Sequence, residues 1–270
     1  MKVMSRDPWQ RRIERARELR QQHSFAAEIL GFYLHIAQFQ KELYQRLQAV
    51  SADPPDSPQT LPGPPELPEL LARFPEFLLV IEQHAPPRLA EYARNLRDGP
   101  EDSRSTLLND FWSGTIGPDG TGMSEFPARA FLQPYAEFVR VRSGIRWDGY
   151  TRSSCPFCNR KPGLGVLRQL GDGGQRCLIC SFCLAEWQFR RILCAGCGEE
   201  NHAKLPVYTA AELQHVRVEC CDTCKSYLKT VDLTKNGLAE PVVDEIATLP
   251  LDLWAQEHGY RKLQPNLLQM

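Results

Sequence analysis

Cysteine is the residue type in this chain whose spacing points most directly to chemistry. All ten cysteines lie between residues 155 and 224, and eight of them form four CxxC pairs. Two residues between cysteines allow a tight turn to present both sulfurs to one metal ion, with backbone amides directed at the thiolates. Two such turns supply the four ligands of a tetrahedral site. The pairs are Cys155/Cys158, Cys180/Cys183, Cys194/Cys197 and Cys221/Cys224.

The order of the pairs predicts two tandem sites rather than one interleaved site. A stretch of 21 residues separates the second pair from the first, and 23 residues separate the fourth from the third, so a β-hairpin fits between the turns of each unit. The first pair of each unit is offset by 39 residues from its counterpart, which is an internal repeat. We expect one metal site from Cys155, Cys158, Cys180 and Cys183, and a second from Cys194, Cys197, Cys221 and Cys224.

Two cysteines are surplus to this scheme. Cys177 precedes Cys180 by three residues and forms a competing pair with it, and Cys220 adjoins Cys221. The internal repeat favours Cys180/Cys183 as the ligand pair. Cys177 and Cys220 are then either small buried hydrophobic residues beside a metal site or accessory thiols with a redox or ligand-exchange role.

The pattern allows either zinc or a rubredoxin-type iron, because both metals accept four thiolates in a tetrahedron. The six histidines show no ligand spacing with one another or with the cysteine pairs. No Ser-His-Asp or paired-carboxylate arrangement stands out. The sequence thus offers metal ligands but no catalytic residues, and we expect a protein that is not an enzyme.

The composition argues against nucleic-acid and membrane partners. The 270 residues are 42% hydrophobic and 24% charged, with 32 basic and 33 acidic side chains. This balance disfavours a protein that binds nucleic acid through bulk positive charge. The longest apolar run, residues 77–81, is far too short to span a membrane, and the charged amino terminus shows no secretion signal. We expect a cytoplasmic protein, in which clustered cysteines indicate metal ligation before disulfides.

Helical patterns fill the first half, and we expect a helical domain over residues 1–148. Asp7-Pro8 is typical of a helix start, and Ser24 is a candidate cap for a second helix with apolar residues at three- and four-residue steps. Seven prolines predict an extended connection over residues 53–68. Further helices are expected over residues 69–84, 87–97, 103–112 and 125–142.

After about residue 146 the pattern changes to short β-prone runs. The turn signal Asp172-Gly173-Gly174 predicts a hairpin between the first two runs. We expect one metal ribbon over residues 149–191, a second over 192–235, and a C-terminal helix and tail over 236–270. The helix should run from Pro241 and stop at Gly259. The β-prone runs cover residues 164–170, 175–179, 187–193, 205–209, 215–218 and 227–233.

The fold class predicted from these patterns is α+β and multidomain. It has an N-terminal helical domain, tandem rubredoxin-like or zinc-ribbon β units, and a C-terminal helix. The residue after each CxxC pair bears on the turn geometry, because such a turn often needs a left-handed residue. Gly198 and Asn159 suit that conformation, and Leu184 and Lys225 suit it less well.

Four sequence segments together resemble a known family. They are SSCPFC, CSFCLAEWQFRRILCAGCG, CDTCKSYLKT and DEIATLPLDLWAQEHGYRK, and from about residue 150 to 262 they are similar to the formate dehydrogenase accessory protein FdhE. The family has a Glu-Trp dipeptide shortly after its second pair. Glu186-Trp187 provides it here, which assigns Cys180/Cys183 and leaves Cys177 as an extra. Lys225 departs from the glycine that the family usually has after its last cysteine.

The resemblance implies a cytoplasmic maturation factor, or chaperone, for a respiratory formate dehydrogenase. Such a factor binds the catalytic subunit of that enzyme, and its CxxC pairs are associated with rubredoxin-like iron binding. The resemblance therefore favours two iron ions, with zinc as the alternative. Two other functions are consistent with the motifs: a zinc-ribbon nucleic-acid-binding protein, which the charge balance disfavours, and a thiol redox protein acting through a CxxC pair.

Overall fold

The computed structural model describes residues 7–50, 60–63, 68–115, 122–171 and 173–270. Most of the predicted proline-rich connection over 53–68 lies outside these residues, and so does Asp172 of the predicted hairpin turn. Contacts divide the chain into two compact units, one of residues 31–144 and one that combines residues 1–30 with residues 145–268. This division differs from the helical domain expected over residues 1–148, because the first 30 residues group with the cysteine-rich part.

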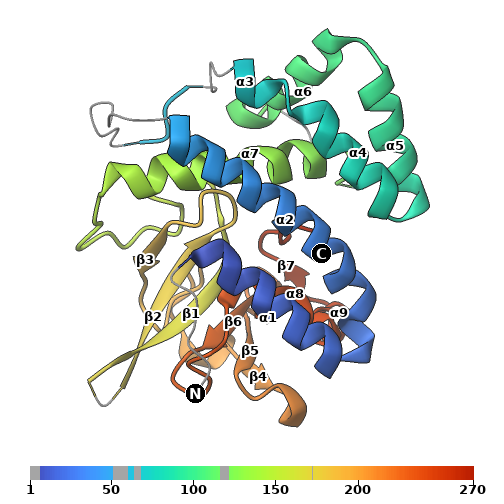
Figure 1. The fold of residues 1–270 in the computed structure, drawn as a ribbon. Helices are drawn as coiled ribbons and strands as arrows, with labels where there is room; N and C mark the ends of the chain where they lie inside the picture. Colours follow the sequence, from blue (N-terminus) through green and yellow to red (C-terminus); the bar gives the residue numbers. More distant parts are fainter. Residues whose placement is uncertain (1–6, 51–59, 64–67, 116–121, 172) are drawn as a thin grey trace. The chain divides into compact units, whose positions relative to one another are not determined.

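The unit of residues 31–144 is helical. Its core includes the rings of Phe39, Phe77 and Phe131, with centroids 5.0 Å apart for the first two and 5.8 Å apart for the last two. Prolines in the first turns of two helices supply a fixed φ and lack only an N–H that would be unpaired there. The helices are most of α2 (Ala27–Val50), then α3 (Pro68–Leu71), α4 (Phe74–His84), α5 (Pro87–Asp98), α6 (Glu101–Ser113) and α7 (Glu125–Ser143) (Figure 1).

The other unit contains one sheet that carries both cysteine groups. Its hydrogen-bonded order is β3-β2-β1-β6-β5-β4, with β7 (Arg261–Lys262) paired to β6. The two predicted ribbons are therefore two halves of a continuous sheet, joined where β1 and β6 run parallel. Within each half the strands are antiparallel, apart from β7, which runs parallel to β6. The strands are β1 (Pro162–Leu170), β2 (Gly173–Cys180), β3 (Glu186–Gln188), β4 (Val207–Thr209), β5 (Val216–Cys220) and β6 (Ser226–Asp232).

The join between the two halves depends on a glycine. Gly165 of β1 lies opposite Thr230 of β6 in the parallel register. A Cβ on Gly165 would overlap the hydroxyl oxygen of Thr230. Only a residue without a side chain allows the two strands to approach this closely.

Strand β3 is shorter than the β-prone run over 187–193 predicts, since it ends at Gln188. The Arg176 guanidinium donates hydrogen bonds to the carbonyl oxygens of Arg190 and Leu193, at 2.8 and 3.3 Å. A buried side chain thus satisfies backbone acceptors that a continued strand would present to a neighbour.

Helix α1 (Pro8–Gln22) packs against α8 (Pro241–Ala247) in this unit (Figure 1). Asp7 caps α1 by accepting a 2.9 Å hydrogen bond from the Trp9 N–H, as the sequence predicts. Ser24 does not cap α2; it begins a single 3-10 turn, Ser24–Ala26. Arg15 of α1 donates to both carboxylate oxygens of the buried Asp244, at 2.9 and 2.6 Å.

The C-terminal helix is divided, whereas the sequence predicts one helix from Pro241. The first part, α8, ends at Ala247, and α9 covers Leu249–Glu257. Pro250 lies in the first turn of α9. Proline has no N–H and its ring crowds the preceding turn, so Pro250 disfavours continuation of α8 and is well placed in the first turn of a new helix.

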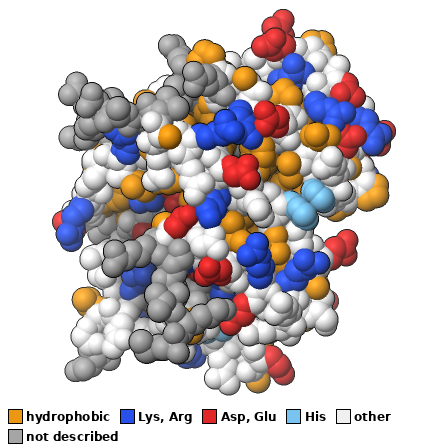
Figure 2. Space-filling view, viewed as in Figure 1, with side chains coloured by type: hydrophobic (Ala, Val, Ile, Leu, Met, Phe, Trp, Pro, Cys, Tyr) orange, Lys and Arg blue, Asp and Glu red, His pale blue; other side chains and the backbone are white. Residues whose placement is uncertain are grey.

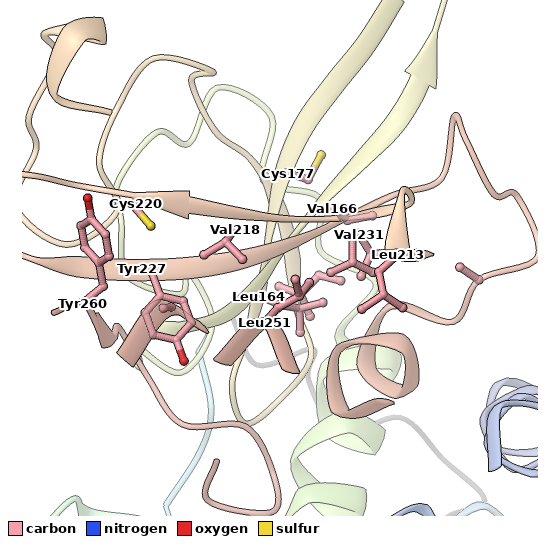
Figure 3. Close-up of a cluster of buried hydrophobic side chains, with 14 residues drawn as sticks. Leu164, Val166, Cys177, Leu213, Val218, Cys220, Tyr227, Val231, Leu251 and Tyr260 are labelled. Carbon is pink, nitrogen blue, oxygen red and sulfur yellow. The ribbon is translucent and has the colours of Figure 1, made fainter. Parts of the chain in front are cut away.

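Fourteen buried side chains form the hydrophobic core between the sheet and α9, and they include Leu164, Val166, Val218, Val231 and Leu251. Figure 3 shows the two surplus cysteines, Cys177 and Cys220, within this cluster. On the face of the chain drawn in Figure 2, basic and acidic side chains lie interspersed among the described residues. None of the described helices has the length and apolarity required to cross a bilayer.

Candidate metal centres

The four CxxC pairs share one turn geometry. In each, the N–H of the first cysteine donates to the carbonyl oxygen of the residue five positions later. The donor and acceptor pairs are Cys155 with Arg160 at 2.8 Å, Cys180 with Ala185 at 2.8 Å, Cys194 with Glu199 at 2.9 Å, and Cys221 with Ser226 at 2.9 Å. This bond closes each turn so that both sulfurs of a pair face the same point.

A left-handed residue follows the second cysteine in all four turns. The φ angles are 59° at Asn159, 55° at Leu184, 79° at Gly198 and 54° at Lys225. The left-handed conformation expected for Gly198 and Asn159 therefore occurs in all four turns. Leu184 and Lys225 adopt it although a Cβ makes it unfavourable by about 1–2 kcal/mol. The turn geometry, and not the preference of the single residue, sets the backbone here.

The four turns bring eight sulfurs together in two groups. One group is Cys155, Cys158, Cys180 and Cys183, and the other is Cys194, Cys197, Cys221 and Cys224; within each, all sulfurs lie within 4.8 Å of one another. All ten cysteines are free thiols in the structure. The grouping is the one that the sequence predicts, and Cys180 groups with Cys183 rather than with Cys177.

The sulfur separations fit a tetrahedral metal site. Four sulfurs that each lie about 2.3 Å from one ion are about 3.8 Å apart. The second group has Sγ–Sγ distances of 3.7 Å for Cys194/Cys224 and 3.7 Å for Cys197/Cys221. The first group is slightly tighter, at 3.5 Å for Cys155/Cys183 and 3.3 Å for Cys158/Cys180. A disulfide would need about 2.05 Å, so neither group is arranged as a covalent bridge.

Backbone amides and one hydroxyl favour negative charge on the sulfurs. The N–H groups of Phe157, Phe182 and Gly196 approach the sulfur of the first cysteine of their turns at 3.4, 3.3 and 3.3 Å. Burial disfavours the Cys224 thiolate, but the hydroxyl and N–H of Ser226 lower the pKa of Cys224 to about 7. These donors are those expected around thiolate ligands.

Exposure distinguishes the two centres. In the first group Cys155, Cys180 and Cys183 are buried and Cys158 is partly buried. In the second, Cys197 is exposed to solvent and Cys224 is partly buried. The sequence carries one sign of this difference: the buried Phe157 and Phe182 occupy the position that Gly196 and Thr223 hold in the second group.

The surplus cysteines lie apart from both groups. Cys177 is 4% exposed and Cys220 is 3% exposed, and both contribute to the hydrophobic cluster of the sheet (Figure 3). Burial raises the pKa of Cys177 to about 11 and that of Cys220 to about 12. Such thiols stay protonated near neutral pH and are poor nucleophiles. These observations match the interpretation of both residues as small buried hydrophobic side chains.

Sequence reasoning missed Ser226, which supports the second centre in two ways. Its hydroxyl lies 2.9 Å from the Cys224 sulfur, and its carbonyl oxygen accepts the Cys221 N–H. The available signal was its position, five residues after the first cysteine of the last turn. No histidine joins either cysteine group within the part of the chain that the structure describes.

Comparison with known proteins agrees with this architecture. The family model for the FdhE central domain matches residues 154–191, and the model for the FdhE C-terminal domain matches residues 192–269. A protein described as "Protein FdhE homolog" from Pseudomonas aeruginosa is 30% identical over 287 aligned residues, covering 98% of this chain and 90% of its own. The chain belongs to the FdhE family.

The resemblance extends beyond the cysteine-rich half. An FdhE homolog from Aquifex aeolicus is 28% identical over 267 residues, covering 95% of this chain and 93% of its own. The crystal structure of the FdhE protein from Pseudomonas aeruginosa matches with a TM-score of 0.67 and 26% identity, over 98% of this chain and 96% of that one. This chain, with a helical N-terminal region followed by a sheet-containing region that carries two tetra-cysteine groups, thus has the fold of that FdhE structure.

Proposed function

We propose that this FdhE-family chain is a non-enzymatic maturation factor that binds the catalytic subunit of a respiratory formate dehydrogenase in the cytoplasm. It uses two metal centres, each held by one tetra-cysteine group. The observation that carries the proposal is the presence of two complete four-sulfur groups, one on each of the two segments that the FdhE domain models match. The domain limits proposed for the centres are residues 149–191 and 192–235.

Four protein ligands per site support a role that is not catalytic at the metal. Catalytic metal sites keep a coordination position for water or substrate, whereas closed four-ligand sites stabilise structure or transfer electrons. We propose rubredoxin-type iron as the occupant, with zinc as the alternative. Four-thiolate iron supplies a one-electron redox couple, while zinc supplies structure only.

A thiol redox role through a CxxC pair has less support. Such pairs become reactive when a helix N-terminus or a cation lowers the thiol pKa. None of the four pairs lies at the N-terminus of a described helix, and each pair faces a second pair. A nucleic-acid role lacks support from the charge, which is nearly balanced over the chain.

Co-purification tests the function. The full-length chain is expressed with the tagged catalytic subunit of a formate dehydrogenase, and the complex is isolated and its absorption spectrum recorded. We expect a stable complex with wild-type protein, and its loss when all eight ligand cysteines are changed to serine. The matched control changes Cys177 and Cys220 to serine, which leaves both groups intact. Equal recovery of the subunit with the eight-serine variant would contradict the proposal. A colourless complex that contains zinc would show that zinc, and not iron, occupies the two centres.

A further inference from the structure

The sheet of the cysteine-rich unit ends in an exposed strand. β4 is the last strand in the hydrogen-bonded order, and it pairs only with β5 among the described strands. All three of its residues are exposed; the side chains of Val207 and Tyr208 are 52% and 38% accessible. Edge strands are commonly protected by charge, proline or a covering loop, whereas this one presents apolar side chains.

The direction of the free hydrogen-bonding groups follows from the register. The Cys220 N–H donates to the Pro206 carbonyl oxygen at 2.9 Å. Since hydrogen-bonded pairs alternate along antiparallel strands, Tyr208 bonds to Val218, and the N–H and C=O groups of Val207 and Thr209 point away from the sheet. No described residue forms a backbone hydrogen bond with Val207 or Thr209 on that outer side.

The internal repeat shows what this kind of edge binds. β1 is the first strand between the two turns of the first half, and β4 has the same place in the second half. The outer edge of β1 is paired with β6, and the Leu233 N–H donates to the Leu167 carbonyl oxygen at 3.0 Å. The chain thus fills one of its two equivalent edges with an extended segment and leaves the other open.

An apolar hollow of about 540 Å³ lies beside the open edge. Tyr208 of β4 packs on Trp254 of α9, with ring centroids 4.5 Å apart, and Phe25 is 49% exposed at the rim. The volume is enough for large side chains of a bound segment. The hollow is lined mainly by apolar side chains, among them Phe25, Tyr208, Leu213, Val218, Leu251 and Trp254.

We propose that β4 binds an extended segment of a partner protein, which adds to its outer edge as β6 adds to β1 and places a large apolar side chain in the hollow. Main-chain hydrogen bonds to Val207 and Thr209 give affinity, and the hollow selects the side chain. The site contains none of the eight ligand cysteines and does not depend on the identity of the client, since it is formed by β4, β5, η1 (Ser24–Ala26), η3 (Ala211–Leu213) and α9.

The test uses full-length protein and short acetylated peptides in which threonine alternates with phenylalanine or with alanine. We expect the phenylalanine peptide to bind about tenfold more tightly or better, because its rings bury apolar surface in the hollow. Amide NMR shifts should concentrate at Val207 and Thr209. N-methylation of the peptide amides that face β4 should abolish binding.

Two proline variants make the test specific. Thr209→Pro removes an outward N–H without touching the bonds between β4 and β5, and it should weaken binding at least tenfold. Gln188→Pro is the matched control, because its N–H points outward at the opposite edge, on β3. Equal affinity for the phenylalanine and alanine peptides, or equal affinity of the wild-type and Thr209→Pro proteins for the phenylalanine peptide, would overturn the proposal. So would a dimer of the chain that Thr209→Pro abolishes, since the occupant would then be a second copy.

Discussion

The two glycines of the third cysteine turn have different roles, although they are two residues apart. Gly198 has a φ of 79°, and a Cβ there would meet no described atom within 4 Å. A Cβ on Gly196 would stand 2.9 Å from the Ser226 hydroxyl and 3.4 Å from the Cys224 sulfur. Gly198 is thus required for its left-handed backbone conformation, and Gly196 leaves room for the Cys224 sulfur and the Ser226 hydroxyl that donates to it.

Alanine at these two positions should therefore give different phenotypes. Gly198→Ala is expected to lower the free energy of unfolding by about 1 kcal/mol, with the metal content unchanged. Gly196→Ala displaces Ser226 or Cys224, so it should speed release of one ion to a chelator. Urea unfolding and a colorimetric chelator assay measure the two effects. Equal release rates for the two variants would refute this assignment.

The ligands themselves follow from sequence because CxxC spacing carries its own geometry. The repeat selects Cys180 over Cys177 as the partner of Cys183. The structure agrees, because Cys180 joins the first sulfur group whereas Cys177, also on β2, belongs to the hydrophobic cluster. The left-handed turns at Leu184 and Lys225 were harder to predict, because side-chain preference alone opposes them. The contribution of Ser226 to the second centre depends on the distance between its hydroxyl and the Cys224 sulfur, which the spacing of residues in the sequence does not give.

At the scale of elements, a buried charge cluster holds α8, α9, β6 and β7 together. The Lys229 ammonium of β6 lies 3.0 Å from Glu245 of α8 and 2.5 Å from Asp252 of α9. Lys262 of β7 also pairs with both carboxylates. Burial alone would raise the pKa of Glu245, but the two ammonium groups and the Asn266 amide lower it to about 2.

Glu245→Gln leaves two buried ammonium groups with one carboxylate. We expect the free energy of unfolding at pH 7 to fall by about 3–5 kcal/mol. Because the folded-state pKa of about 2 lies below the ordinary value of 4.5, the contribution of the carboxylate is complete above about pH 4.5 and is lost as the pH falls toward 2. The difference between the two proteins should shrink over that range in denaturant titrations.

Loss of metal at low pH should affect wild-type protein and Glu245→Gln alike, so it cancels in the difference between their free energies of unfolding. Glu212→Gln, at an exposed position of the same unit, is the control and should change stability little at any pH. A stability difference between Glu245→Gln and wild type that stays constant from pH 5 to pH 2 would show that the carboxylate does not carry the effect.

Element types could be predicted better than their connections. Periodicity finds the helices of residues 87–143 and most strands within a few residues, but the helix expected over residues 69–84 is divided into α3 and α4. It misses the break at Thr248, where Pro250 overrides a continuous apolar stripe. It also misses the β1–β6 pairing, since a parallel contact between residues 65 positions apart depends on the Gly165–Thr230 approach and not on local pattern.

At the scale of the whole molecule, the sequence order does not give the compact units. The first 30 residues read as part of a helical domain, yet α1 joins the cysteine-rich unit. Arg15 explains this, because its guanidinium binds Asp244, which also contacts the His215 ring at 2.8 Å and accepts a 2.9 Å hydrogen bond from the Glu240 N–H. A single charged residue on α1 and another on α8 form no periodic pattern, so the sequence does not predict that they contact each other across more than two hundred residues.

Metal stoichiometry tests the account most directly. Full-length protein, purified without added metal, should contain two ions per chain, and Cys180→Ser with Cys183→Ser should contain one. Because Cys197 of the second group is exposed and the first group is mostly buried, a chelator should remove the ion of the second group from the wild-type protein faster than the ion of the first group. In the Cys180/Cys183 variant, the remaining ion should leave at that faster rate. Wild-type protein that holds no metal, with its cysteines joined in disulfides, would contradict the account.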